Sequence, residues 1–333
     1  QCIFPRHLDN GGGHVHRDFG GSNQFYSWQI NEFWKYTADK EAARKLAPIL
    51  DKIINQTYQE YDPDGNLLLA WGQQIGNQED YVSTPYDGTS PSIEGIRMLT
   101  TRANLARALD DEDTARQCED KADLILSRLR EKLWQQDLGR FAFFMDPQGI
   151  IRPDGQYHTY IYPALWNLVD DLDAWTGMRH LRESLMGEGG EVYASNNFPY
   201  HAVGTWGMQA GAAQQPWSAW GLAAVGCRNE TFLPLRAVAR WVMNEDHRGS
   251  WPEVSTEHTA AYFSPPAGLY VQSTIEALFG LRMNRPEKEL LVKPSFPDDW
   301  PKASVQLAEL SAEYRKRRGR LEYTIESTEP LAR

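Results

Sequence analysis

The fold class is decided by residues 92–134, which read SIEGIRMLTTRANLARAL-DDE-DTARQCEDKADLILSRLREKLW. Apolar residues recur at helical spacing on both sides of a short acidic turn, which predicts a helical hairpin over 92–109 and 113–134. The first helix is mostly apolar and the second is strongly amphipathic. A helix that is apolar all round is enclosed by neighbours, whereas an amphipathic helix faces solvent on one side. The stretch therefore predicts an inner helix paired with an outer one.

The same pairing recurs on both sides of this hairpin. Residues 22–38 and 40–58 form a pair that ends at the turn Asp62–Asn66. Five further helices are predicted over residues 160–172, 175–185, 215–227, 231–244 and 268–281. Long loops separate the pairs, and such loops usually carry function in a compact domain. The layout predicts a mainly α fold with inner and outer helices in two concentric rings.

The pattern changes near the C-terminus. Residues 290–292, 304–307 and 321–325 read as short strands separated by Pro and Gly. We therefore predict a helical domain over residues 1–286 and a β-strand segment over residues 287–333. So small a sheet is marginal without a partner, so we expect it to dock on the helices or on N-terminal residues that precede this chain.

The composition excludes several classes of protein. Lys and Arg number 34 against 45 Asp and Glu, a net charge of −11, which does not suit a nucleic-acid partner. No apolar run reaches the ~18 residues of a membrane helix. The three cysteines lack disulfide or metal-ligand spacing, which predicts free thiols in a reducing, cytoplasmic compartment and neither metal nor cofactor. The chain starts at Gln1 rather than Met, as we expect of a processed or truncated product.

Aromatic residues are the unusual feature of the composition. The chain holds 12 Trp, 15 Tyr and 12 Phe among 333 residues. Phe and Leu fill a core without an indole N–H that needs a hydrogen-bond partner. The flat faces of Trp and Tyr instead suit sugar rings, whose C–H groups stack on them while the sugar hydroxyls form hydrogen bonds. The excess of Trp in an acidic chain therefore favours a carbohydrate ligand.

Three loops concentrate acids, aromatic residues and small residues. The first, residues 14–22, places Arg17 and Asp18 among two histidines and several glycines. A role in capping the next helix would explain Asp18 or Ser22 alone. Fixed charges beside flexible backbone suit the recognition of hydroxyl groups. We therefore predict that Arg17 and Asp18 bind the substrate.

The second loop, residues 70–88, holds four side-chain amides and three acids. Asp80 lies there among aromatic residues, and such surroundings favour the protonated form of a carboxyl group. We therefore predict Asp80 as a proton donor, with Trp71, Gln78 and Tyr81 as substrate contacts. Glu94, just inside the following helix, is interpreted as a residue that complements the helix dipole.

The third loop, residues 249–258, contains Glu253 directly after Trp251 and Pro252, in a rigid aromatic setting. Hydrolysis of a glycosidic bond needs two acids. One protonates the leaving oxygen, while the other activates water or attacks carbon. We predict Glu253 as the partner of Asp80, provided that the fold brings the two together.

These loops, in this order, resemble the catalytic domains of six-hairpin, (α/α)6-toroid glycoside hydrolases, and most of all glycosidases of the glucosidase-I and glucosylglycerate-hydrolase type. His16-Arg17-Asp18 is similar to the sugar-binding aspartate motif of these enzymes, and residues 78–85 are similar to their general-acid loop. Trp251-Pro252-Glu253 looks like the segment of their base glutamate. Residues 214–220 resemble an inner helix whose start faces the sugar.

The resemblance implies an (α/α)6 toroid that lacks its first hairpins in this chain, since nine helices rather than twelve are visible. It also implies an inverting, exo-acting glycosidase that needs no metal and removes a terminal sugar, with Asp80 as acid and Glu253 as base. Further substrate contacts are expected from the following side chains: His158, Trp206, Gln214, Trp217 and Trp251.

Two other functions remain open. A toroidal polysaccharide lyase or sugar epimerase would transfer protons through His158, Tyr160 or His201, and a lyase would release an unsaturated product that absorbs in the near ultraviolet. A non-catalytic carbohydrate-binding toroid would bind sugars without turnover, with Asp80 and Glu253 as helix-end residues. The sequence specifies neither the sugar and its anomer nor the oligomeric state.

Overall fold

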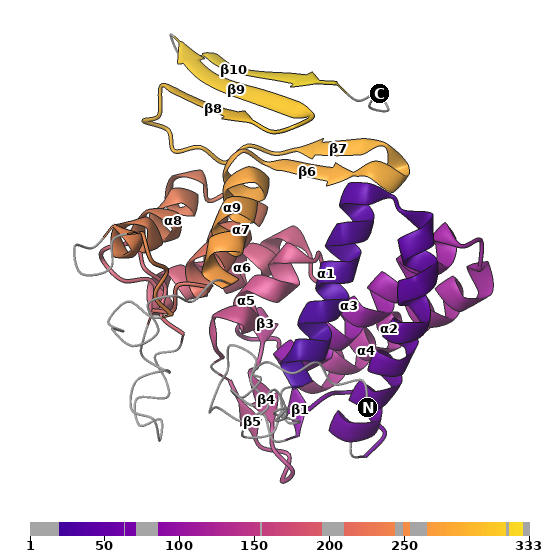
Figure 1. Cartoon of the computed structure of the whole chain (residues 1–333). Coiled ribbons are helices and arrows are strands. Elements are labelled where there is room, and N and C mark those ends of the chain that lie inside the picture. The colour runs from indigo at the N-terminus through magenta and orange to yellow at the C-terminus, as the bar shows by residue number, and fades with distance from the viewer. Residues whose placement is uncertain are drawn as a thin grey trace. The chain divides into compact units, whose positions relative to one another are not determined.

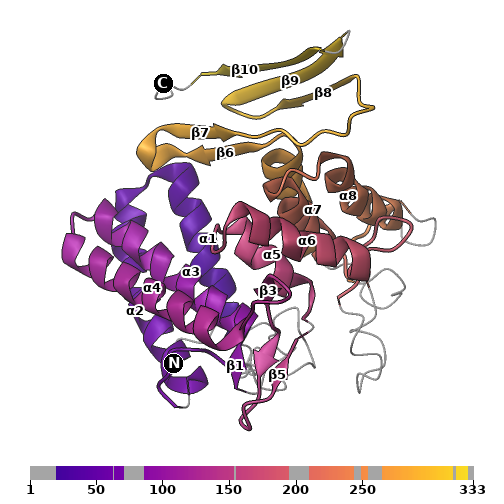
Figure 2. The same cartoon turned by 180° about the vertical axis from the view of Figure 1, so that it is seen from behind.

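The computed structural model describes residues 20–62, 64–70, 86–153, 155–194, 210–243, 249–253, 265–317 and 320–328, with the side chains of 20–25 and 265 excepted. The chain forms two compact units, shown from opposite sides in Figures 1 and 2. Unit 1 comprises residues 1–177 and 195–208, and unit 2 comprises residues 178–194 and 209–333.

Unit 1 is built around one central helix. Its long helices are α1 (Gly20–Thr37), α2 (Lys40–Tyr61), α3 (Thr89–Ala108) and α4 (Glu112–Leu133). α3 packs against the other three and against the short helix α5 (Tyr157–Leu165), and α1 to α4 lie side by side in both views (Figures 1 and 2). Sixteen of the 20 residues of α3 are buried but only five of the 22 in α4. The predicted pair of an enclosed and an amphipathic helix is confirmed.

The two helical hairpins of unit 1 turn in the same way. Asp39 accepts hydrogen bonds from two main-chain amides of α2 at 2.9 and 3.0 Å, and Asp111 accepts one from Thr114 in α4 at 3.1 Å. Each aspartate satisfies donors that the first turn of a helix leaves free. The preceding residues, Ala38 and Asp110, have φ angles of +53° and +62°. This left-handed backbone reverses the chain between the paired helices.

Short strands in unit 1 were not predicted. β1 (Asp87–Gly88), β4 (Phe144–Met145) and β5 (Ile151–Arg152) form one antiparallel sheet, and β2 (Trp134–Gln135) pairs with β3 (Arg140–Phe141). The helix predicted over 160–172 was also placed too late. The structure has α5 end at Leu165, and the chain turns at Asn167, where φ is +55°, before α6 (Asp171–Leu185) begins.

Unit 2 repeats the arrangement of an enclosed helix and an amphipathic partner. Its helices are α7 (Gln214–Ala224), α8 (Arg228–Val242) and α9 (Pro265–Ser273), and a π-helical segment (Thr274–Leu278) follows α9 directly. α7 packs against all three of its neighbours. Ten of the 11 residues of α7 are buried, against five of the 15 in α8. With these, nine α-helices lie in the described ranges, as the periodicity predicted.

The C-terminal strands also belong to unit 2. β6 (Leu281–Asn284) pairs with β7 (Glu289–Val292), and β8 (Lys302–Gln306), β9 (Leu310–Arg317) and β10 (Arg320–Ser327) form an antiparallel sheet in the order β10-β9-β8. The three predicted strands are confirmed, whereas β6 and β9 were missed. Because unit 2 holds these strands together with α7 to α9, the predicted domain boundary at residue 286 stays a prediction.

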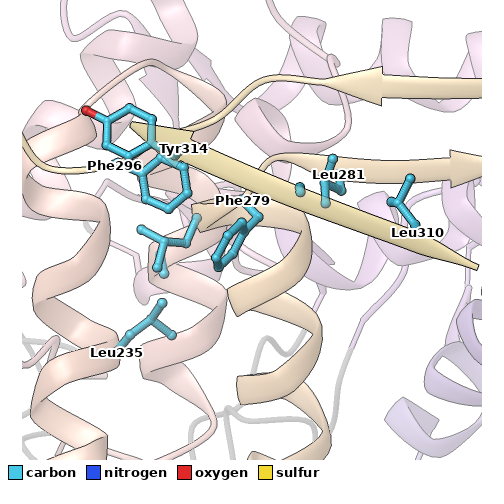
Figure 3. Packing of buried hydrophobic residues seen from close by; sticks show 9 residues of the cluster. Leu235, Phe279, Leu281, Phe296, Leu310 and Tyr314 are labelled. Atoms are coloured by element: carbon cyan, nitrogen blue, oxygen red, sulfur yellow. The ribbon is translucent and has the colours of Figure 1, made fainter. Parts of the chain in front are cut away.

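The sheet docks on the helices of its own unit through an apolar cluster (Figure 3). The ring of Phe296 lies 4.5 Å from the Tyr314 ring of β9 and 5.0 Å from the Phe279 ring, which follows the π-helical segment. Leu235 of α8 joins the same cluster. The Tyr323 hydroxyl of β10 donates to the Phe279 carbonyl at 2.6 Å. Docking on helices, one of the two predicted arrangements for the sheet, is therefore confirmed.

Two further expectations concern the described part of the chain. Cys118 and Cys227 are free thiols. Among the described helices, none combines the length with the apolar character that a membrane crossing requires.

Candidate active site

Five of the predicted site residues lie in the described part of the chain: His158, Gln214, Trp217, Trp251 and Glu253. The others lie outside the described residues, and so does His201 of the alternative lyase mechanism: Arg17, Asp18, Trp71, Gln78, Asp80, Tyr81 and Trp206. Unit 2 holds four of the five described residues, so it carries most of the geometry of the candidate site.

Glu253 is held at its main chain by the residues that lead into α7. Its carbonyl accepts a hydrogen bond from the Ala212 amide at 2.8 Å. Ala212 is buried, and α7 begins two residues later at Gln214. Glu253 itself is half-buried. The fold thus brings Glu253 and the start of α7 together, although 41 positions separate Ala212 from Glu253.

Two neighbouring glutamines shape the start of α7. The Gln214 side chain is 6% exposed, and its Oε1 accepts a hydrogen bond from the Gly211 amide at 2.8 Å. The Gln215 side chain is fully buried and binds main-chain atoms of Val192 and Gly211. Gln214 was predicted to contact substrate, whereas Gln215 was not singled out. The sequence signal was a pair of amides at the start of a helix whose next residues are apolar.

Aromatic rings flank the segment that contains Glu253. The half-buried Trp251 ring lies 5.4 Å from the ring of Tyr270 in α9, and burial raises the pKa of the Tyr270 hydroxyl. Trp217 is 1% exposed and packs edge-on against Trp220 at 5.8 Å. A stacking role for Trp217 stays a prediction, and the burial of its ring favours a packing role in the core of unit 2.

In unit 1, the start of α3 rests on charges and hydroxyl groups. Asp87 is 1% exposed, and its carboxylate accepts hydrogen bonds from Lys132 Nζ at 3.1 Å and from Asn66 Nδ2 at 2.8 Å. Thr89 donates its hydroxyl to the Ala142 carbonyl at 2.6 Å, which ties α3 to the strand region. A buried carboxylate needs such partners, because an isolated buried charge is very costly.

The segment that contains Asp80 starts and ends at fixed positions in unit 1. Just before it, Ala70 donates its amide to the Tyr61 carbonyl at 2.8 Å. Across its two ends, Gly88 donates its amide to the Leu69 carbonyl at 2.9 Å. Just after it, the Tyr86 hydroxyl donates to Asp64 at 2.5 Å, a bond that raises the pKa of Tyr86 to about 12.

A buried charged cluster in unit 1 was missed in the sequence. Glu94, interpreted as complementing the helix dipole, is only 2% exposed. One turn along α3, the guanidinium of Arg97 lies 4.3 Å from the centre of the Trp166 ring. Burial lowers the pKa of Arg97, while the charges of Glu32 and Glu94 act in the opposite direction. The available signal was a Glu–Arg pair three residues apart on a mostly apolar helix.

Two residues of the alternative lyase mechanism, His158 and Tyr160, lie in the described part of unit 1. His158 is fully buried and stacks on the Tyr157 ring at 4.0 Å. The Tyr160 hydroxyl accepts a hydrogen bond from the Gly155 amide at 2.8 Å and is buried too. Both side chains are buried in α5, and a role of His158 or Tyr160 in substrate binding or proton transfer stays a prediction. As for metals, the described residues contain no group of three or more His, Cys, Asp or Glu side chains able to hold an ion.

Solved structures share the fold of this chain. A protein titled sialidase superposes with a TM-score of 0.73 at 15% identity, over 96% of this chain and 32% of the other. The GH78 family rhamnosidase of Bacillus sp. GL1 gives 0.67 at 14% identity, over 93% and 32%. A rhamnosidase from Klebsiella oxytoca with rhamnose bound gives 0.54 at 14% identity, over 74% and 42%.

All three titles are those of glycoside hydrolases, so the expected likeness to glycosidases is confirmed at the level of fold. The chain spans about a third of the length of the first two. No protein-family model and no curated protein matches the chain. The specific likeness to glucosidase-I and glucosylglycerate hydrolases stays a prediction.

Proposed function

We propose that this chain is the helical core of a glycoside hydrolase that removes a terminal sugar from an oligosaccharide or small glycoside. The observation that carries the proposal is the fold shared with a sialidase and a rhamnosidase over more than nine-tenths of the chain. The abundance of Trp and Tyr supports it, because aromatic faces suit sugar rings. In this proposal the helical hairpins belong to an (α/α)6 toroid.

The proposed chemistry uses two carboxyl groups. Asp80 donates a proton to the leaving oxygen, and Glu253 removes a proton from the water that attacks the anomeric carbon. Arg17 and Asp18 hold hydroxyl groups of the terminal sugar. The remaining contacts of the proposal come from these side chains: Trp71, Gln78, Tyr81, His158, Trp206, Gln214, Trp217 and Trp251.

The described surroundings of Glu253 support its part in this proposal. Its main chain is fixed to Ala212, and the buried Gln214 lies at the adjacent start of α7. Trp251, two residues before Glu253, packs against Tyr270. A base must be held in place, because reactivity falls steeply when reacting groups are misplaced.

The stereochemical outcome is part of the proposal. Inversion requires about 6.5–9.5 Å between the two carboxyl groups, which leaves room for a water molecule, whereas about 5 Å would produce retention through a covalent intermediate. NMR of the first-formed product on aryl glycosides, rhamnosides and sialosides included, distinguishes the two. A product of the opposite anomeric configuration is expected, and retention would contradict the inverting mechanism.

Substitution of the two acids tests the proposal directly. Glu253→Gln and Asp80→Asn should each lower kcat by about 10²–10⁴-fold on the best substrate of that panel, with folding intact by circular dichroism. Glu257→Gln, in the same loop as Glu253, serves as the matched control and should keep wild-type kcat. Normal turnover in both Glu253→Gln and Asp80→Asn would contradict the assignment of the two acids.

A further inference from the structure

The side chain of Gln215 joins two pieces of unit 2, the segment around Val192 and the turn that leads into α7. Its Oε1 accepts a hydrogen bond from the Val192 amide at 2.7 Å, and its Nε2 donates to the carbonyls of Val192 and Gly211, both at 2.9 Å. The side chain is fully buried. The amide thus uses both of its donor hydrogens and one acceptor site on main-chain atoms, away from competing water.

Gly211 is held at both its amide and its carbonyl. Its amide donates to Gln214 Oε1 at 2.8 Å, while its carbonyl accepts from Gln215 Nε2 at 2.9 Å and from the Gln214 main-chain amide at 3.2 Å. The approach is close, because a Cβ atom at position 211 would lie 3.0 Å from Cδ and Nε2 of Gln214. A glycine therefore permits the two glutamines to fix this stretch of main chain.

The fixed stretch leads directly to Glu253. The residue after Gly211 is Ala212, whose amide donates to the Glu253 carbonyl at 2.8 Å. Only main-chain atoms lie between the Gln215 amide and the Glu253 backbone, so displacement of Gly211 must move the donor that anchors Glu253. The connection runs from Gln215 through the Gly211 carbonyl and the Ala212 amide to Glu253.

We propose that Gln215 is a positioning residue, whose buried amide fixes the Gly211–Ala212 main chain and thereby sets the place of Glu253. The structural part of this inference stands on the hydrogen bonds alone. Its catalytic consequence rests on the proposed function, in which Glu253 is the base. Gln215 acts through main-chain atoms, in contrast to Gln214, which is expected to contact the substrate.

The variant that removes the amide is Gln215→Leu, which keeps the approximate volume of the side chain. It removes the side-chain hydrogen bonds to the main chain of Val192 and leaves the Gly211 carbonyl with the longer bond from the Gln214 amide, at 3.2 Å. The matched control is Thr231→Val. The Thr231 hydroxyl is likewise buried and bridges two segments of unit 2, through the Cys227 carbonyl and Ser295 Oγ, both at 2.9 Å. Its described hydrogen bonds lead to Cys227 and Ser295 rather than to Glu253, so the variant reports the general cost of losing a buried hydrogen bond.

Hydrogen exchange of the full chain tests the structural part. The Ala212 amide is the donor to Glu253, so its exchange rate reports that bond directly. In Gln215→Leu it should exchange about tenfold faster than in wild type, while Thr231→Val leaves it unchanged. Equal protection of Ala212 in Gln215→Leu and wild type would overturn the inference. If Gln215→Leu does not fold, Gln215→Glu takes its place, because it keeps the acceptor for Val192 and loses the donor to Gly211.

Kinetics at a temperature where both variants are folded test the catalytic part. Gln215→Leu should lower kcat by up to about 100-fold with little change in KM, because a misplaced base slows the chemical step rather than binding. Thr231→Val should keep both constants. Wild-type kcat in Gln215→Leu beside an inactive Glu253→Gln would overturn this inference and leave the proposed function standing. An active Glu253→Gln would overturn the proposed base instead, and Ala212 exchange would then decide the positioning role alone.

Discussion

The central helices of the two units, α3 and α7, are both buried along nearly their whole length, yet their first turns are supported by different chemistry. Neither helix starts with a side-chain cap. At the start of α3 a buried carboxylate pairs with a lysine, and hydroxyl groups reach main-chain carbonyls. At the start of α7 two neutral amides bind main-chain atoms.

This difference shows that the start of an enclosed helix can be held either by charged side chains or by neutral ones. The two arrangements should respond differently to substitution. A buried ion pair costs little when intact and much when one partner is lost. A buried amide depends on geometry instead, since it presents fixed donors and acceptors. We therefore expect unit 1 to be sensitive to charge at the start of α3, and unit 2 to be sensitive to shape at the start of α7.

The largest stability effect should come from Lys132→Met. The variant leaves the buried Asp87 carboxylate with the Asn66 amide and removes the Lys132 cation that offsets its burial. We expect a loss of about 3 kcal/mol in the free energy of unfolding, measured in urea. The double variant Lys132→Met/Asp87→Asn, which buries no charge, should recover more than half of that loss. A single variant as stable as wild type would contradict a charge-dependent start of α3.

The next largest losses of stability should differ between two buried hydroxyl groups, those of Thr89 and Ser218. Thr89→Val removes the donor to the Ala142 carbonyl, which belongs to another segment, and should cost about 2 kcal/mol. Ser218→Ala removes a donor to the Gln214 carbonyl within α7 itself and should cost less than about 1 kcal/mol. Both side chains are fully buried, so they form a matched pair in urea unfolding. Equal losses in the free energy of unfolding would contradict the expectation that a hydrogen bond between segments is worth more than one within a helix.

The smallest loss of stability should come from the outer helix α4, whose first turn is capped by the exposed carboxylate of Asp111. Hydrogen bonds from the Thr114 side chain and amide lower the pKa of Asp111. A lowered pKa in the folded state means that the stabilisation is present above the unfolded value and is lost as the pH falls through the folded one. Asp111→Ala should therefore lower Tm by about 2 °C at neutral pH and by less in acid.

Asp111→Asn is the control for that titration, because it keeps a capping oxygen without a titrating group. Its Tm difference from Asp111→Ala should stay constant as the pH falls. If the wild-type advantage over Asp111→Ala persists unchanged below the pKa of Asp111, the cap does not depend on the charge.

Much of the fold could be predicted from the sequence, because the hydrophobic periodicity that indicates a helix is a local property of the chain. The periodicity located nine helices, and the acidic turn at 110–112 located the reversal between α3 and α4. What could not be read was long-range. β1 and β4 are two residues long and exist because Gly88 pairs with Phe144. The ends of α5 and of the π-helical segment follow from positive φ angles at Asn167 and Gly280, which the apolar pattern runs through.

The candidate site was readable to a smaller extent for the same reason. Residue types and their aromatic neighbours pointed to Glu253 and Trp251, and the start of α7 was recognised as relevant. The hydrogen bond from Ala212 to Glu253 spans 41 positions and leaves no local trace. The role of Gln215 could not be predicted from the sequence, because two adjacent glutamines differ only in the main-chain groups that each one contacts in the fold.

The main-chain hydrogen bonds on either side of residues 71–85 bear on how this stretch of sequence can be varied. Gly88 is bonded to Leu69 and Ala70 to Tyr61, so main-chain hydrogen bonds of the described residues hold the two ends of this stretch close together. The entropic cost of closing a loop grows slowly with its length, so insertions and replacements there are inexpensive. Replacing the residues between these two ends by the equivalent residues of a glycoside hydrolase of this fold, with Asp80 kept, is therefore a practical way to alter substrate preference under the proposed function.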